Sequence, residues 1–126
     1  MKRSIKQTAA AAGSTPFTTA VEANGFVFIS GQLATELGSN RLYTENITQE
    51  TTKVMENIGE VLKAAGLGYD DLVKCTIYMT SLQYYAEVSR IYMSFFQGDP
   101  PARETVAVKE LPRGVNLQIS GIAVRS

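Results

Sequence analysis

Two stretches of this chain carry apolar side chains on both faces of an extended backbone. They are GFVFISGQ at residues 25–32 and VNLQISGIAV at residues 115–124. Since neighbouring residues of a strand point to opposite faces, the two phenylalanines of the first stretch point one way, and Val27 and Ile29 point the other. A sheet built from such strands needs apolar cover on both faces, and this requirement limits the folds open to the chain.

Two segments have the three- and four-residue spacing of apolar side chains that is typical of an amphipathic helix. The first runs from residue 47 to 65, with Asn46 as its N-cap and Gln49 placed to complete a capping-box-like start. It ends in AAGL, where Gly66 supplies the left-handed residue. The second is expected from about residue 82 to 96, before a glycine and two prolines. Its expected apolar stripe consists of Leu82, Tyr85, Val88, Tyr92 and Phe95.

Shorter strand patterns fill the rest of the chain. A strand is expected near residues 18–22, joined to the next one by an Ala-Asn-Gly turn, because Asn-Gly is a strong hairpin signal. Another strand is expected within DDLVKCTIYMTSL at residues 70–82, with Val73 on the same face as Cys75. RETVAVKEL at residues 103–111 predicts a further strand before the last one.

The element order is therefore strands, helix, strand, helix and two strands, which is typical of an α+β fold with two helices on one sheet. Two helices cover only one face. A monomer would leave the other face exposed to water, so the sequence favours an oligomer in which sheets pack together, with cover by loops as the alternative. With no repeat, linker or composition break in 126 residues, a single domain is expected over residues 1–126.

The residue types that are missing restrict the chemistry. The chain has no histidine and one cysteine, which excludes a Ser-His-Asp triad, a Cys-His pair, a histidine-ligated metal, a cysteine-rich zinc site and an internal disulfide. It contains neither GxxxxGK(S/T) nor GxGxxG, so a P-loop or Rossmann nucleotide site is unsupported. Twelve basic residues balance twelve acidic ones without forming a block, so nucleic acid is not an expected partner.

No stretch approaches the roughly 18–20 apolar residues that span a membrane, so no membrane partner is expected. The alanine patch near the N-terminus is too short and too weakly apolar for the core of a signal peptide. A cytoplasmic location is therefore expected. Cys75 lies in mid-strand on an apolar face, which favours a core position over a role as nucleophile.

A single arginine lies where a proline pair meets a strand. In DPPARETVAVKELPRG, residues 99–114, the prolines fix the path of the chain and withhold backbone donors just before Arg103. A guanidinium held there is suited to a planar carboxylate, because its fork donates two parallel hydrogen bonds. A solvated arginine, or one half of a structural ion pair, is the alternative, and it is favoured if no other information is used.

The chain resembles the Rid family of reactive-intermediate (imine) deaminases, also called the YjgF or L-PSP family. The resemblance covers nearly the whole chain; each motif is weak alone, but together they are specific. The motifs are FISGQ at 28–32, NIGEVLKAAGL at 57–67, DLVKCTIYMTSL at 71–82, YMSFF at 92–96, PPAR at 100–103, ELP at 110–112 and GIAV at 121–124.

The resemblance implies a chorismate-mutase-like fold: a six-stranded mixed sheet with two helices on one face, assembled as a homotrimer with ligand clefts between adjacent subunits. It implies that Arg103, in the PAR segment, grips the carboxylate of a 2-imino or 2-enamino acid, and that a backbone group at Gly31 helps to hold the ligand. The products are a 2-oxo acid and ammonia. Because imines hydrolyse in water without help, no metal or organic cofactor is required.

The chain departs from the family's pattern at three positions. Gln118 stands where the best-known branch carries a glutamate on the final strand, and an amide orients water but takes no proton near neutral pH. Phe17 replaces a tyrosine of the cleft, and Ser89 replaces an asparagine on the second helix. In addition, Thr105 takes a place often held by cysteine, on the same face of its strand as Arg103.

Three functions are open at this stage. The first is hydrolysis of 2-iminobutanoate and 2-iminopropanoate, weakened by Gln118, with the proton passing to the substrate's own nitrogen or to Glu104 or Glu110. The second is a non-catalytic trimer that binds small carboxylic acids or a partner protein, which Gln118 favours. The third is the endoribonuclease or translation-inhibitor role attached to the L-PSP name, which the absence of histidine and of a basic stripe disfavours.

Overall fold

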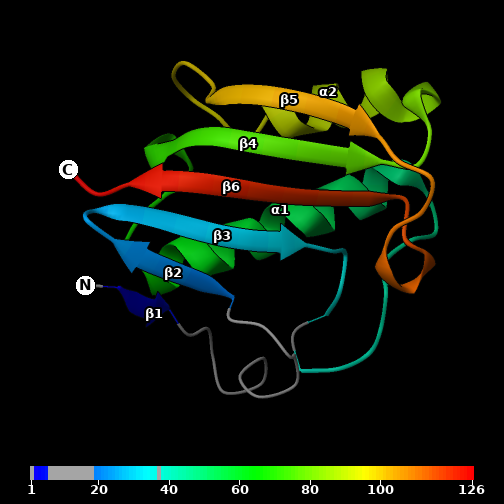
Figure 1. Cartoon of the computed structure of the whole chain (residues 1–126). Helices are drawn as coiled ribbons and strands as arrows, with labels where there is room; N and C mark the ends of the chain where they lie inside the picture. Colours follow the sequence, from blue (N-terminus) through cyan, green and yellow to red (C-terminus); the bar gives the residue numbers. More distant parts are fainter. Residues whose placement is uncertain (1, 6–18, 37) are drawn as a thin grey trace.

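The structure, a computed structural model, describes residues 2–5, 19–36 and 38–126 (Figure 1). Its centre is a six-stranded sheet with the order β1-β2-β3-β6-β4-β5. All neighbouring strands pair antiparallel except β4 and β5, which are parallel, so the expected mixed sheet is confirmed. The strands are β1 (Arg3–Ile5), β2 (Ala20–Ala23), β3 (Phe26–Gln32), β4 (Leu72–Met79), β5 (Ala102–Ala107) and β6 (Leu117–Val124).

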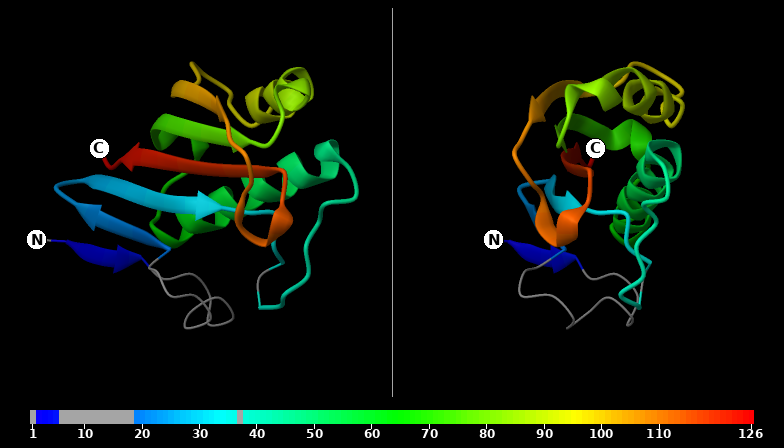
Figure 2. Two further views of the ribbon diagram at one scale, coloured as in Figure 1. Left: turned by 45° about the vertical axis from the view of Figure 1, so that its right-hand side comes forward. Right: turned by 90° about the vertical axis from the view of Figure 1, so that its right-hand side faces the viewer.

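Two helices, α1 (Ile47–Ala64) and α2 (Tyr85–Met93), pack on one face of this sheet. Seen along the strands, in the right-hand view of Figure 2, both helices lie on the same side. The expected two-layer α+β fold is thus confirmed. The second helix is shorter than expected, because Leu82–Tyr84 forms a separate 3-10 turn. No helix in the described part of the chain is both long and apolar enough to cross a bilayer.

The ends of α1 follow the capping chemistry expected from the sequence. The Asn46 side chain accepts a hydrogen bond from the backbone N–H of Gln49 at 2.8 Å, and the Gln49 side chain accepts one from the backbone just before the cap. At the other end, Gly66 has φ +77°, which lets the N–H of Leu67 reach back to the carbonyl of Leu62 at 2.8 Å. Both helix boundaries are therefore set by local sequence.

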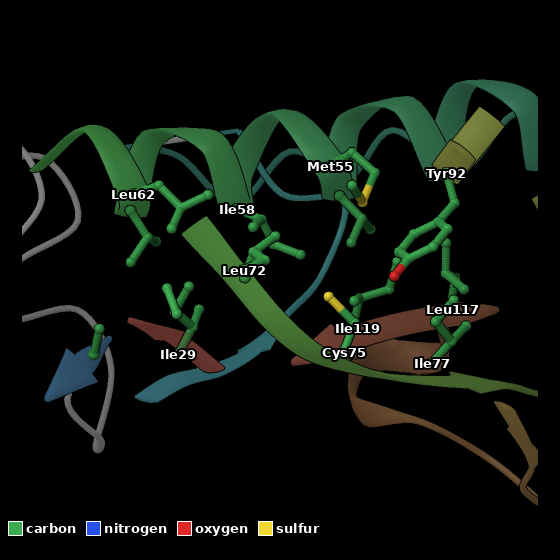
Figure 3. Close-up of a cluster of buried hydrophobic side chains, with 14 of the residues drawn as sticks. Ile29, Met55, Ile58, Leu62, Leu72, Cys75, Ile77, Tyr92, Leu117 and Ile119 are labelled. Atoms are coloured by element: carbon green, nitrogen blue, oxygen red, sulfur yellow. The ribbon is translucent and has the colours of Figure 1, made fainter. Parts of the chain in front are cut away.

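The hydrophobic core fills the space between the helices and the sheet. In Figure 3, side chains of α1 point down onto the strands, and the Tyr92 ring enters from α2 with its hydroxyl towards Cys75. The largest fully buried apolar side chains of this layer are Tyr92, Met55, Ile58, Leu62, Ile77, Met79, Leu117 and Ile119. The alternating burial of β6, in which every second side chain is buried, reflects the period of an extended strand.

A buried carboxylate ties the start of α1 to the start of β6. Glu50 is fully buried, and its oxygens accept hydrogen bonds from the backbone N–H of Asn116 (2.8 Å), the side-chain amide of Asn116 (2.9 Å) and the backbone N–H of Leu117 (3.0 Å). These three donors, together with the first turn of the helix, offset the cost of burying the charge. The contact fixes β6 directly before Gln118.

Two local features of the sheet differ from, or were missing in, the sequence prediction. β1 carries no pattern of its own and was not expected at residues 3–5. Val73 was expected in the core, but Leu72 is buried instead and Val73 is 45% exposed. A register shift between Leu72 and Lys74 inverts the alternation there. The Asn-Gly turn is confirmed, with positive φ at both residues of the β2–β3 hairpin.

The face of the sheet away from the helices carries large apolar side chains that are exposed to solvent. Phe26 and Phe28 of β3 are 43% and 46% exposed, and their rings lie 6.2 Å apart. Val106 of β5 is 41% exposed. Within the described residues no helix covers this face, as the sequence analysis anticipated. We call it the open face below.

A carboxylate close to the β1 edge of the sheet joins three segments. Glu22 of β2 is bonded to Arg3 of β1 at 2.6 Å and, through two hydrogen bonds of 2.9 Å, to Arg125 after β6. Arg125 also donates to the carbonyl of Ala65 at the end of α1 (2.7 Å). The hydrogen bonds from Arg125 and Arg3 lower the pKa of Glu22 from 4.5 to about 2.

This pKa predicts a pH-dependent stability. The carboxyl of Glu22 binds a proton more weakly in the folded chain than in the unfolded chain. Its contribution to the free energy of unfolding is therefore complete above pH 4.5 and is lost as the pH falls towards 2. Urea unfolding at several pH values should show a difference between wild type and Glu22→Gln that shrinks over this window. Arg125→Met should reduce the same difference. A difference in unfolding free energy between wild type and Glu22→Gln that stays constant down to pH 2.5 would contradict the lowered pKa of Glu22.

Candidate functional site

Arg103 lies on the edge strand β5, on the side of the sheet that faces the helices. Its register partner on β4 is Cys75, and the next pair is Ile77 with Thr105. Since Cys75 and Ile77 are buried beneath the helices, Arg103 and Thr105 share that face, as expected from strand alternation. The Arg103 side chain is half-buried.

Helix α2 surrounds the guanidinium group. One Nη2–H of Arg103 donates to Ser89 Oγ at 2.8 Å. The Cζ atom lies 5.2 Å from the centre of the Tyr85 ring and 5.2 Å from that of Tyr92, within the range of cation–π contacts. The sequence analysis treated both tyrosines as packing residues. Their spacing of four and three residues around Ser89 marks one helix face, but only the tertiary contact between α2 and β5 reveals its partner.

In the part of the chain that the structure describes, the charge of Arg103 is not matched by a carboxylate. Among residues 2–5, 19–36 and 38–126, the ion pairs involve other arginines and lysines. The neighbouring Glu104 points to the opposite face of β5, where it pairs with Lys74 at 2.9 Å. A half-buried guanidinium with hydrogen-bond donors to spare is suited to bind an external anion.

Two buried hydroxyl groups border the same region. Thr105 Oγ1 and the Tyr92 hydroxyl are buried, and neither has a hydrogen-bond partner within the described part of the chain. Such groups generally meet a water molecule or a ligand. Cys75 is fully buried, and this burial raises the pKa of its thiol, which agrees with the expected core position.

Gln118 and Gly31 form a second group, on the open face. Gln118 of β6 lies between the buried Leu117 and Ile119, so its side chain points away from the core. The amide crosses over Gly31: a Cβ atom placed on Gly31 would collide with Gln118 Nε2. The register shift between Ile29 and Gln32 brings the Gly31 backbone to this side.

The sequence-predicted site residues thus fall into two groups within one chain. Arg103, Ser89 and Thr105 lie on the helix side of the sheet, and Gly31 and Gln118 lie on the open face. Phe17 lies outside the described residues. One chain by itself therefore does not bring the arginine and the glutamine to the same side of the sheet.

A hollow of about 550 Å³ lies elsewhere, beside α1. Three carboxylates border it, which makes it a poor site for an anionic ligand. Its lining residues are Glu36, Lys53, Glu56, Asn57, Gly59, Glu60 and Tyr69. In the residues that the structure describes, no group of three or more acidic or cysteine side chains is arranged to hold a metal ion.

Comparison with known proteins gives three consistent similarities. Residues 7–125 match the sequence family described as Endoribonuclease L-PSP. A 2-iminobutanoate/2-iminopropanoate deaminase from Mus musculus is 34% identical over 125 residues, covering 99% of this chain and 93% of the mouse protein. The E. coli TdcF structure with bound serine is 31% identical, with a TM-score of 0.91 over 98% of this chain and 99% of TdcF.

The contact between Gly31 and Gln118 predicts a local response to substitution. Gly31→Ala should keep the fold, with the unfolding free energy within about 1 kcal/mol of wild type, because the clash is with a flexible side chain and φ is not positive. The Gln118 side-chain amide resonances should shift in NMR spectra. Gly68→Ala, where nothing lies within 4 Å, is the matched control. Unshifted Gln118 resonances would show that the contact is absent.

Proposed function

Because the chain belongs to the Endoribonuclease L-PSP family, also called the Rid or YjgF family, we propose that it hydrolyses small 2-imino acids to 2-oxo acids and ammonia. The substrates proposed are 2-iminobutanoate and 2-iminopropanoate. The observation that supports the proposal best is Arg103, a half-buried guanidinium without a carboxylate partner in the described chain. Its fork fits the carboxylate that every 2-imino acid carries.

The reaction needs little from the protein. A water oxygen adds to the imine carbon while the C=N electron pair moves to nitrogen, which takes one proton from that water. The remaining hydroxyl proton then passes to nitrogen as the C–N bond breaks and C=O forms, which releases ammonia. Holding the carboxylate and a water molecule in the right relative position lowers the entropic part of the activation barrier to hydrolysis. Gln118 can orient that water through its amide, but the proton has to reach the substrate's nitrogen from water.

Glu104 and Glu110 are weak candidates for the missing base. Glu104 is held by Lys74 on the face opposite to Arg103. Glu110 is exposed and lies beyond the end of β5. We therefore propose that the substrate's own nitrogen receives the proton, and that turnover is slow compared with relatives that carry a carboxylate at the position of Gln118.

A complete site is proposed to form between subunits. Arg103 lies on the helix side of the edge strand β5, whereas Gly31 and Gln118 lie on the open face, so one site with both groups requires two chains. Packing of the open faces in a homotrimer would cover Phe26 and Phe28, and because each ring is a little under half exposed, its burial contributes roughly half of the 1.5–3 kcal/mol given by full burial of a phenylalanine. Assembly and substrate binding are then coupled.

Gln118 also supports a second candidate, a non-catalytic trimer that binds 2-oxo acids. A site with an intact carboxylate clamp and no proton acceptor binds without accelerating the reaction. RNA cleavage, the activity that the name of the family describes, has less support, since the sequence has no histidine and equal numbers of acidic and basic residues.

The activity test uses freshly generated 2-iminobutanoate and follows ammonia release above the rate in buffer. Arg103→Ala should lower kcat/KM at least about a hundredfold, as expected for the loss of two charge-assisted hydrogen bonds. Arg103→Lys keeps the charge but not the fork and should lose about tenfold. Gln118→Glu should raise kcat. Arg90→Ala, on the exposed side of α2, is the control.

Inactivity of both wild type and Gln118→Glu would end the enzyme proposal. In that case, an Arg103-dependent rise in Tm with 2-oxobutanoate would identify the non-catalytic binder.

The assembly test places a charge on the open face. Phe28→Asp should raise the dissociation constant of the trimer at least about tenfold, because a carboxylate would be buried in place of an aromatic ring. Analytical ultracentrifugation over a range of concentrations measures this. Leu82→Asp, at an exposed position before α2, should leave the trimer intact. A monomeric wild type, or a trimer unaffected by Phe28→Asp, would contradict the proposal.

A further inference from the structure

One face of α2 presents two aromatic rings and a hydroxyl group to a single cation. Tyr85, Ser89 and Tyr92 are spaced by four and then three residues, so all three lie on the side of the helix that meets Arg103. Each ring centre lies 5.2 Å from the Arg103 Cζ atom. We call these three residues the α2 frame.

The three residues of the frame contact the guanidinium from the same helix. The centres of the Tyr85 and Tyr92 rings each lie 5.2 Å from Cζ, and Ser89 Oγ accepts a hydrogen bond from Nη2 at 2.8 Å. Aromatic cover of this kind leaves the edge of the guanidinium, with its N–H donors, as the accessible part.

We propose that the α2 frame selects planar carboxylates over tetrahedral oxyanions, with Tyr85 as the specificity-determining residue. A carboxylate binds edge-on with both oxygens in the plane of the guanidinium. A sulfonate or phosphonate has a third oxygen out of that plane, directed at the electron-rich face of a flanking ring, which repels it. The inference rests on the proposed function, since it assumes that Arg103 binds the substrate's carboxylate.

Tyr85 is the member of the frame that can be changed without loss of the fold. Tyr92 is fully buried in the core, so its removal would leave a cavity (Figure 3). Tyr85 is 47% exposed, at the first position of α2. It therefore forms the outer wall beside Arg103, where an approaching ligand meets it first.

The test compares two anions with the same ethyl group, propanoate and ethanesulfonate, by NMR titration of the full chain. Wild type and Tyr85→Phe, which keeps the ring, should bind propanoate at least tenfold more tightly than ethanesulfonate. Tyr85→Leu should weaken propanoate binding about two- to fivefold, the usual size of an exposed cation–π contact, and bring the two affinities within about threefold. Ala64→Ser, at an exposed position at the end of α1, should behave as wild type.

The outcomes separate this inference from the proposed function. If wild type binds propanoate and Arg103→Ala does not, but Tyr85→Leu keeps the tenfold preference, the frame has no role in selection and the clamp proposal stands. If wild type binds neither anion, both proposals fail. Unfolding midpoints measured alongside show whether Tyr85→Leu is folded, and a merely structural role would not change the ratio of the two affinities.

Discussion

Within the described residues, the sheet has helices on one face only, and much of the molecule follows from this constraint. α1 and α2 supply a full hydrophobic layer for the inner side, where Ile77 and Ile119 are completely buried. The other side has Phe26 and Phe28 but no helix in the described chain to cover them. Burial of apolar surface drives both folding and association, so a face of this kind favours contact with another chain. In the proposed trimer, burial of apolar surface would stabilise the contact between chains, as it stabilises the fold of each chain.

Local patterns predicted the elements that local chemistry determines. The predictions of both ends of α1 and of the β2–β3 hairpin were correct, because helix caps and Asn-Gly turns depend on neighbouring residues alone. β1 was missed, since three residues carry no periodicity and the strand exists only by pairing with β2. Val73 was assigned to the wrong face because a register shift depends on the partner strand β6, which the β4 sequence does not contain. The number of strands came from family resemblance.

The site was predictable as a set of residues but not as an arrangement. The PPAR segment identified Arg103, and alternation placed Thr105 beside it. The α2 frame was not foreseen, because Tyr85 and Tyr92 have the spacing of ordinary packing residues and acquire a different role only where α2 meets β5. Nor could the sequence tell that Arg103 and Gln118 point to opposite sides of the sheet, since that depends on strand order and not on spacing along the chain.

The placement of Arg103 and Gln118 on opposite faces links the uncovered face of the sheet to the proposed chemistry. A clamp on the helix side and an amide on the open face cannot hold one small ligand from the same chain, so a shared site exists only where the edge strand β5 of one copy approaches the open face of another. In the proposed trimer the open face would therefore bury Phe28 and present Gln118 to the ligand. Because imine hydrolysis needs only orientation and proton movement, a site assembled from two surfaces suffices for it.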